Sequence, residues 1–373
     1  MVAELKRKKK PVRRDGAGWK WIWNKGRGLA ETVLFPFTIL ASLYGIVCRL
    51  RIFLYRKGVL SQKKVDCRVI SIGNLTVGGT GKTPFTIFLA EQWRERGYTV
   101  GIVSRGYRGN YKGPVRWVSD GREVLEGPET VGDEPYLMAQ RLSGIPVVVS
   151  ADRFKGCRAL LERFKPDVIL LDDGFQHLRL HRDLNLLLVD ATNPFGNGAL
   201  LPRGSLREPL SGIRRADVVI FTRSEDPFDA SEWVGEIERL GLPCIRTAFI
   251  PARWVRLKTG ETLPPSALAK EPVVGFSGIG NPESFSALLH RIGVDLRAQV
   301  IFRDHHVYQA IELEEIQRQA GVHGAKRVVT TEKDAVKIKG FIPADLDVWA
   351  LQVEVVFWEG QEKWEPLLLG GRS

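Results

Sequence analysis

Cysteine is scarce in this sequence, with four among 373 residues, at positions 48, 67, 157 and 244. No two of them stand at the short spacing of a metal knuckle or a redox pair, so a zinc-ribbon or disulfide-framed protein is excluded. Scattered single cysteines are typical of reduced core residues in a cytosolic protein. A polytopic membrane protein, a fibrous repeat and a disordered chain are excluded too, because 44% of the residues are hydrophobic and 26% are charged, as in ordinary globular proteins.

Acidic residues are nearly missing from the start of the chain. Residues 1–64 hold 16 of the 55 Lys and Arg but only 3 of the 43 Asp and Glu, a net charge of +13. The rest of the chain is almost neutral, with a net charge of −1. The positive charge therefore predicts an anionic partner for the N-terminal extension alone, and it disfavours a broad nucleic-acid-binding face on the folded domains.

The N-terminal extension combines the features of a segment that lies on a membrane. Basic residues fill positions 6–14, three tryptophans follow within 19–23, and an uncharged stretch of 17 residues spans 32–48, with further basic residues after it. Because a spanning helix needs roughly 20 apolar residues, we expect a helix over 32–48 at or partly inside an anionic bilayer surface, either lying flat or spanning. No small-residue cleavage motif follows, so a cleaved signal peptide is not expected.

Two other interpretations of this extension stay open. The apolar helix could cover the folded domain, or a disordered basic tail could precede a helix of the core. A nuclear-localisation or nucleic-acid-binding tail fits poorly, because the tryptophans and the long apolar stretch are foreign to such tails.

A phosphate-binding loop is the clearest local motif. A predicted strand over 68–72 leads into a glycine-rich segment and then Lys82 and Thr83, and a predicted helix follows. This order predicts a P-loop, in which backbone N–H groups face phosphates, Lys82 neutralises them and the Thr83 hydroxyl holds Mg²⁺. Thr76 stands where the usual pattern has its first glycine, so we expect Gly78 and Gly79 to supply the flexibility. The predicted nucleotide-binding residues are Thr76, Val77, Gly78, Gly79, Thr80, Gly81, Lys82 and Thr83.

A second acidic element accompanies the loop. The apolar segment 166–171 predicts a strand that ends in Asp172 and Asp173. In α/β sheets the ligand crevice lies at the carboxyl ends of the strands, so a carboxylate there can bind Mg²⁺ directly or through water. Alone this element is often just a turn, but beside a P-loop it indicates phosphoryl transfer or hydrolysis with a magnesium nucleotide.

Strands and helices alternate along the rest of the chain. This pattern predicts an α/β fold of two α/β/α domains with mostly parallel sheets, the first of them a P-loop domain. We expect a basic leader and membrane-associated helix over 1–64, a P-loop domain over 65–225, a connection over 226–271 and a smaller α/β domain over 272–373.

Two loops carry further polar candidates. Asp304, His305 and His306 follow a predicted strand of the second domain, and adjacent histidines on a loop do not easily share one metal ion. A histidine there is ordinarily structural, or alternatively a general base or a group that orients one. The loop over 193–209 carries arginines that are candidate phosphate contacts, although Arg–Glu pairs in loops are usually solvated.

Eight short motifs occur along the chain in order. They are GNLTVGGTGKT (73–83), SRGY (104–107), GDEP (132–135), DDGFQH (172–177), LPRGSLREP (201–209), FSGIG (276–280), DH (304–305) and TTEKD (330–334). Together they resemble the tetraacyldisaccharide 4′-kinase family of the lipid A pathway of Gram-negative bacteria. The resemblance covers about residues 30–360 and rests on DDGFQH and the motif order more than on the P-loop. The leader at 6–14 precedes it, so the family implies no role for that leader.

The resemblance implies a function. It implies ATP-dependent transfer of the γ-phosphate to the 4′-hydroxyl of a tetraacyldisaccharide 1-phosphate, with ATP and Mg²⁺ as cofactors. It also implies a C-terminal domain that closes the active-site cleft and a peripheral or monotopic protein on the cytoplasmic face of the bacterial inner membrane. Its partners would be the lipid substrate and an anionic membrane surface, and not nucleic acid.

The resemblance also implies roles for single residues. Asp133 is the expected base for the 4′-hydroxyl, and His305 the group that orients it or tunes its pKa; the Asp-His adjacency favours His305 over His306. The expected Mg²⁺ environment, without a choice of direct ligands, is Thr83, Glu134, Asp172 and Asp173. The expected substrate contacts are Arg105, Tyr107, Gln176 and Arg203.

A membrane-associated partitioning or targeting ATPase is the alternative function. Such proteins share the Gly-Lys-Thr loop and often a basic amphipathic helix. They usually place a second lysine early in the loop, where Val77 stands, and they leave the second domain with Asp304 and His305 unexplained. A nucleic-acid-binding protein is the third hypothesis, disfavoured by the near-neutral body.

Overall fold

The computed structural model describes residues 12–13, 29–225 and 230–369. The chain divides into two compact units. The larger unit is Trp19–Phe249 with Glu354–Ser373, and the smaller unit is Met1–Gly18 with Ile250–Val353. Most of the basic leader at 6–14 lies outside the described residues, apart from β1 (Val12–Arg13), and so do the tryptophans at 19–23.

The boundaries of these units differ from the expected domain boundaries. The segment 226–271 is not an irregular connection, because α7 (Ser231–Glu238) and β9 (Cys244–Arg256) lie in it. The chain passes between the units within two long strands, β9 and β14 (Val348–Glu359), rather than through a linker.

The C-terminal segment also departs from expectation, because it belongs to the larger unit. Helix α11 (Trp364–Leu369) brings Trp364, which is buried, against the rings of Phe85 and Phe357 at centroid distances of 5.9 and 5.6 Å. Burial of a tryptophan among aromatic rings is strongly stabilising, so this contact holds α11 against the larger unit.

The larger unit is built on a sheet with the strand order β9-β8-β7-β2-β6-β3-β5-β4. Its pairs are parallel except for β4 with β5 at the edge. Strands such as VILLD and LNLLLVD are buried along their whole length, as apolar parallel strands covered on both faces are. The further strands are β2 (Arg68–Asn74), β3 (Val100–Ser104), β4 (Arg116–Ser119), β5 (Val147–Val149), β6 (Val168–Asp172), β7 (Leu184–Asp190) and β8 (Val218–Thr222).

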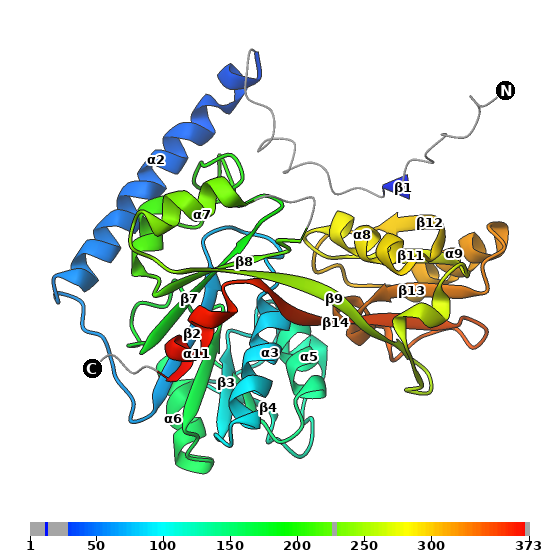
Figure 1. The fold of residues 1–373 in the computed structure, drawn as a ribbon, viewed down its shortest axis with the longest axis horizontal. Helices are drawn as coiled ribbons and strands as arrows, with labels where there is room; N and C mark the ends of the chain where they lie inside the picture. Colours follow the sequence, from blue (N-terminus) through cyan, green and yellow to red (C-terminus); the bar gives the residue numbers. More distant parts are fainter. Residues whose placement is uncertain (1–11, 14–28, 226–229, 370–373) are drawn as a thin grey trace. The chain divides into compact units, whose positions relative to one another are not determined.

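Helices connect these parallel strands, as Figure 1 shows. They are α3 (Lys82–Glu95), α4 (Pro128–Val131), α5 (Asp133–Arg141), α6 (Arg153–Arg163), the 3₁₀ helix Leu210–Arg215 and α7. The carboxyl ends of β2, β6, β7 and β8 lie at one edge of the sheet, because the strands are parallel neighbours. That edge is where the sequence places its candidate residues.

The smaller unit repeats the parallel arrangement. Its strand order is β1-β12-β11-β13-β14, and these pairs are parallel. The predicted α/β fold with mostly parallel sheets is confirmed in both units. The elements of the smaller unit are β10 (Thr262–Leu263), a 3₁₀ helix (Pro265–Leu268), β11 (Pro272–Ser277), α8 (Pro282–Ile292), β12 (Asp295–Ile301), α9 (Ala310–Val322), β13 (Arg327–Thr331) and α10 (Glu332–Ile338).

A single long helix, α2 (Leu29–Arg56), precedes the sheet of the larger unit (Figure 1). It contains the expected helix over 32–48, and its part Phe35–Arg56 is long and apolar enough to cross a membrane. It contacts the larger unit along a narrow stripe that includes the buried Ala41 and Gly45. Only 11% of its most apolar window is buried, so it is not a core helix.

Candidate active site

The phosphate-binding loop connects β2 to α3. Gly78 and Gly81 have left-handed backbones (φ +119° and +80°), and a Cβ on Gly81 would come within 2.3 Å of a phenylalanine ring, so glycine is required there. Thr76 stands where P-loops usually have their first glycine, and it is tolerated because the backbone is still extended at residue 76. It forms an antiparallel bridge with the residue after Ser205, and the Val77 N–H donates to the Ser205 carbonyl at 2.8 Å.

Residues at the carboxyl end of β8 hydrogen-bond to the backbone of the phosphate-binding loop. The Thr222 hydroxyl donates to the Thr80 carbonyl (3.0 Å), and the Arg223 guanidinium donates to the Gly79 carbonyl (2.9 Å). Arg223 is itself fixed by Asp190, at the end of β7, at 2.6 Å. Local sequence patterns predicted no role for these residues, although polar residues at the ends of two apolar strands are a signal for such contacts. They fix the loop before any nucleotide binds.

Asp172 is a buried carboxylate at the end of β6. It is 1% exposed and accepts hydrogen bonds from the hydroxyls of Ser104 (2.8 Å) and Thr86 (3.4 Å). Burial, together with the negative charges of Glu134 and Asp173, raises its pKa to about 6. Asp172 therefore carries negative charge that the surrounding protein compensates incompletely.

The negative charge of Asp173, the next residue, is compensated by nearby positive charges. One guanidinium nitrogen of Arg207 lies 2.8 and 3.0 Å from its two carboxylate oxygens, and Lys82 Nζ lies 3.5 Å from Oδ1. Burial alone would raise its pKa, but these two positive charges outweigh burial and hold the pKa well below its usual range. The same Lys82 ammonium donates to Asn74 Oδ1 at 3.2 Å. The phosphate-loop lysine is thus held in place by acceptors from β2 and from the segment after β6.

Gln176 supports the loop from the same segment. Its amide nitrogen donates to the Asn74 carbonyl and to Glu208 Oε1, both at 2.8 Å, and its amide oxygen accepts from Arg207 at 3.3 Å. These contacts use both ends of the amide. They argue for a supporting role rather than the expected contact with substrate.

Asp133 and Glu134 begin α5. Asp133 is 9% exposed, and its Oδ1 accepts from the Glu134 N–H at 3.1 Å. The Glu134 charge acts on Asp172, so the start of α5 lies near the aspartate pair. A Cβ on Gly132 would come within 2.7 Å of the Tyr107 carbonyl, which places the expected Arg105–Tyr107 contacts against the start of this helix. The larger unit therefore brings Thr83, Asp133, Glu134, Asp172, Asp173, Arg105 and Tyr107 to one end of its sheet.

The remaining expected substrate contact is Arg203. It lies in the 193–209 loop, where its backbone carbonyl accepts from Asn197 at 3.2 Å. Its expected contact with the sugar stays a prediction.

Arg153 is a buried cation that the sequence analysis missed. It is 3% exposed at the start of α6, and it donates to the backbone carbonyl of Asp173 at 3.3 Å. Burial lowers its pKa, and the charge of Asp173 opposes that shift. The Ser-Ala-Asp-Arg sequence after β5 could have suggested it, because it repeats the pattern of an apolar strand that ends in polar residues.

In the smaller unit the structure separates the two adjacent histidines. His306 stacks on Phe302 with ring centroids 4.6 Å apart, and its Nε2 contacts Glu312 at 2.9 Å. His305 has a left-handed backbone (φ +57°), and its Nε2 lies 3.2 Å from Lys333 Nζ. His306 is therefore held by Phe302 and Glu312, and the choice of His305 as the group that orients or tunes the base stays a prediction.

Lys333 also determines which nitrogen of His305 carries the proton. An ammonium group only donates, so His305 Nε2 accepts and the ring proton resides on Nδ1. Lys333 donates to Asp304 Oδ1 as well, at 3.3 Å. Although burial opposes ionisation, the charge of Lys333 lowers the pKa of Asp304, so the carboxylate stays ionised.

The donor set in the larger unit fits a magnesium ion that arrives with a nucleotide. Within the described ranges, no three His, Cys, Asp or Glu side chains gather closely enough to hold a metal on their own. Mg²⁺ typically takes only one or two protein carboxylates and completes its shell with phosphates and water. Asp172 is suited to this role because its charge is poorly compensated, whereas Asp173 is already neutralised by Lys82 and Arg207.

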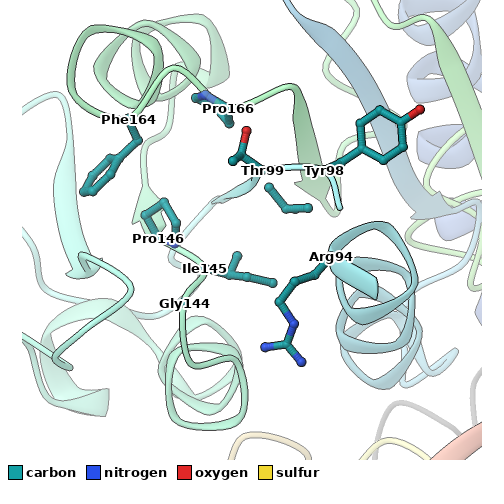
Figure 2. A pocket seen from close by; sticks show the side chains of 9 residues that line it. Arg94, Tyr98, Thr99, Gly144, Ile145, Pro146, Phe164 and Pro166 are labelled. Carbon is teal, nitrogen blue, oxygen red and sulfur yellow. The ribbon is translucent and has the colours of Figure 1, made fainter. Parts of the chain in front are cut away.

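A separate cavity of about 220 Å³ lies elsewhere in the larger unit (Figure 2). Arg94, Thr99, Pro146 and Pro166 are among its lining residues. Thr99, Pro146 and Pro166 precede β3, β5 and β6, so the cavity opens at the amino ends of the strands. Parallel α/β sheets bind substrates at the opposite edge, and this cavity is not the active site.

Known proteins resemble this chain over most of its length. A family model described as Tetraacyldisaccharide-1-P 4′-kinase matches residues 32–370. The tetraacyldisaccharide 4′-kinase of Geobacter sulfurreducens is 42% identical over 84% of this chain and 87% of its own length. That of Syntrophus aciditrophicus is 38% identical over 90% of this chain and 93% of its own.

A solved structure is similar throughout as well. The crystal structure of an "apo" form of LpxK from Aquifex aeolicus in complex with ATP superposes with a TM-score of 0.74. It is 37% identical in sequence, and the match covers 91% of this chain and 98% of that one.

Proposed function

The chain belongs to the tetraacyldisaccharide 4′-kinase family, and from that premise we propose that it transfers the γ-phosphoryl group of ATP to the 4′-hydroxyl of a tetraacyldisaccharide 1-phosphate. The observation that carries the proposal is the unequal aspartate pair at the carboxyl end of β6. Asp173 is neutralised by the phosphate-loop Lys82, and Asp172 beside it is left with uncompensated charge. P-loop enzymes hold Mg²⁺ with a Ser or Thr of the loop and a nearby aspartate, and Asp172 has the charge available for that role.

The loop and the start of α3 bind the phosphates of ATP in this proposal. Backbone N–H groups at a helix N-terminus attract phosphate oxygens, and Lys82 adds a full positive charge. Thr83 and Asp172 would hold Mg²⁺, which supplies charge neutralisation for the phosphoryl group when bound. Arg153, Arg207 and the β8 residues keep these groups in place.

The transfer itself requires a base, because a sugar hydroxyl is a poor nucleophile. We assign this role to the Asp133 carboxylate, which takes the proton of the 4′-hydroxyl as the sugar oxygen bonds to the γ-phosphorus. The bond from that phosphorus to the β–γ bridging oxygen breaks at the same time, and ADP leaves. For His305 we propose the role of orienting this base or tuning its pKa.

Helix α2 supports a membrane location. Leu43, Ile46 and Leu50 on its outer side are each more than half exposed, and basic residues Arg56 and Lys57 stand at its end. A basic apolar helix of this kind binds anionic bilayers, with each basic residue near the surface contributing about 1 kcal/mol. The substrate is itself a membrane lipid, so we propose an anionic membrane surface, rather than nucleic acid, as the partner.

The same helix favours a monotopic arrangement over a spanning one. Tyr44 and Arg51, in the middle of α2 and near its end, hydrogen-bond to backbone carbonyls of the larger unit. A spanning helix would have to leave those polar contacts for hydrocarbon, which costs several kcal/mol per unsatisfied group. We therefore propose that α2 lies on the cytoplasmic face of the inner membrane, where ATP is available.

The test is a transfer assay. The purified protein is incubated with γ-labelled ATP, Mg²⁺ and tetraacyldisaccharide 1-phosphate in detergent micelles. Label on the lipid that depends on both Mg²⁺ and the acceptor supports the kinase. ATP hydrolysis with no label on the lipid would instead support the partitioning ATPase and overturn the proposal.

A further inference from the structure

Helix α2 hydrogen-bonds to Arg207 and Gln176, two residues that support the phosphate loop. The Tyr44 hydroxyl donates to the Arg207 carbonyl at 2.6 Å, and the Arg51 guanidinium donates to the Gln176 carbonyl at 3.2 Å. A Cβ on Gly45 would come within 2.7 Å of Leu200, so the helix is seated closely on this loop region. Tyr44 is 37% exposed and Arg51 is exposed, so both contacts lie at the edge of the surface through which α2 packs on the rest of the larger unit.

Arg207 connects the helix to the reactive groups. Its N–H donates to the carbonyl of Leu75 in the phosphate loop at 2.7 Å, and its guanidinium binds Asp173, the partner of Lys82. The Tyr44 contact fixes the remaining polar group of its backbone. The residue is thus held by α2 on one side and by the phosphate loop and its aspartate on the other.

Gln176, in the segment after β6, repeats this arrangement. Its carbonyl accepts from α2 through Arg51, and its side chain donates to the carbonyl of Asn74, the residue that also binds Lys82. Two chains of polar contacts therefore run from α2 to Lys82, and the Arg207–Gln176 hydrogen bond at 3.3 Å joins them. One passes through Arg207 and Asp173, and the other through Gln176 and Asn74.

We infer that Tyr44 and Arg51 are positioning residues for the phosphate loop, so that α2 serves nucleotide binding and phosphoryl transfer as well as membrane attachment. A catalytic group that must be held within about 0.5 Å depends on the residues that lock its supports. Burial raises the pKa of Tyr44 to about 12, so its hydroxyl remains a donor over the whole working range. The kinetic part of this inference rests on the proposed function, whereas the nucleotide-binding part does not.

The first experiment compares two conservative variants on the same helix. Tyr44→Phe removes the hydroxyl that contacts Arg207, and Tyr55→Phe removes a hydroxyl from a half-buried tyrosine of α2 with its ring retained. We expect Tyr44→Phe to weaken ATP affinity or lower kcat by about three- to tenfold, the effect of one lost hydrogen bond, with the KM for lipid unchanged. Tyr55→Phe should match the wild type in all three.

The second experiment separates the positioning role from membrane attraction. Arg51→Met and Arg49→Met each remove one positive charge from α2, so both should weaken binding to vesicles of phosphatidylglycerol and phosphatidylcholine to the same degree. Only Arg51→Met loses the bond to Gln176, so only this variant should change ATP affinity or kcat in detergent micelles.

The outcomes are distinct. The inference is overturned if Tyr44→Phe and Tyr55→Phe give equal ATP affinity and kcat, or if Tyr44→Phe lowers only the melting temperature. It is also overturned if Arg51→Met and Arg49→Met behave alike in micelles. If the wild type transfers no phosphate to the lipid, the proposed function fails, and the ATP-affinity comparison still decides the role of α2.

Discussion

The adjacent residues Asp172 and Asp173 give opposite predictions for the same substitution. Burial and nearby carboxylates raise the pKa of Asp172 from 3.8 to about 6, which means that ionising it in the folded protein costs about 3 kcal/mol. Asn in its place would carry no charge, and its amide could still accept from Ser104 and donate to Thr86. We therefore expect Asp172→Asn to stabilise the nucleotide-free protein at pH 7.5 while it abolishes most phosphoryl transfer.

The sign of this effect follows from proton linkage. Asp172 binds its proton more tightly in the folded state than in the unfolded state, so stability falls as pH rises from about 4 to about 6. The penalty is complete above the folded pKa, and about half of it is present at pH 5. Asp172→Asn should thus raise the melting temperature by roughly 6–10 °C at pH 7.5 and by about half as much at pH 5.

Asp173→Asn is the matched control. Its carboxylate is bound by Arg207 and Lys82 and its pKa is lowered, so its charge stabilises the folded state at neutral pH. Removing it should cost about 2 kcal/mol and lower the melting temperature. Differential scanning calorimetry of both variants without nucleotide or Mg²⁺ measures the two shifts. A fall in melting temperature for Asp172→Asn at pH 7.5 would refute the reasoning.

Three further substitutions test other parts of the site. Asp133→Ala should lower turnover by at least about 100-fold, the contribution of a positioned base, while ATP affinity survives; equal loss of both would indicate a structural role. Lys333→Met should lower kcat about tenfold, because the His305 ring proton is then no longer restricted to Nδ1. Lys333→Arg should retain part of the wild-type kcat because arginine is still a donor; a fully active Lys333→Met variant would contradict this. Deleting residues 1–31 removes 10 basic residues and should weaken binding to anionic vesicles, while activity on substrate in detergent micelles stays nearly unchanged. Unaltered vesicle binding would exclude this segment as a membrane anchor.

The phosphate loop and the aspartate pair could be predicted because their signals are local. GGTGKT stands between a short apolar strand and a helix, and DDG follows a second apolar strand, so nearest neighbours in sequence already define both elements. The replacement at Thr76 could not be explained in the same way. Its reason is a bridge to a segment 130 residues further on, which no local pattern contains.

The different roles of Asp172 and Asp173 could not be predicted from the sequence for the same reason. The two residues are chemically identical and adjacent, and only contacts with the distant Lys82 and Arg207 distinguish them. The return of α11 to the larger unit likewise depends on a packing contact between Trp364 and Phe85, far apart in the chain. Sequence patterns give elements and local motifs, whereas charge compensation and unit boundaries arise from long-range contacts.

The unequal pair finally predicts how magnesium binding depends on pH. Below pH 6 a proton occupies Asp172, and Mg²⁺ must displace it, so apparent Mg²⁺ affinity should fall as pH is lowered and binding should release protons. Asp173 cannot contribute to this dependence, because Arg207 and Lys82 keep it ionised throughout that range. Calorimetric titration of the ATP-loaded wild type with Mg²⁺ in buffers of different ionisation enthalpy, at pH 5.5 and 7.5, measures the proton release directly. At pH 5.5 the Asp172→Asn variant should release fewer protons than the wild type, because only the terminal phosphate of ATP then loses a proton to Mg²⁺. Equal release from the variant and the wild type would mean that Asp172 does not titrate with Mg²⁺ binding.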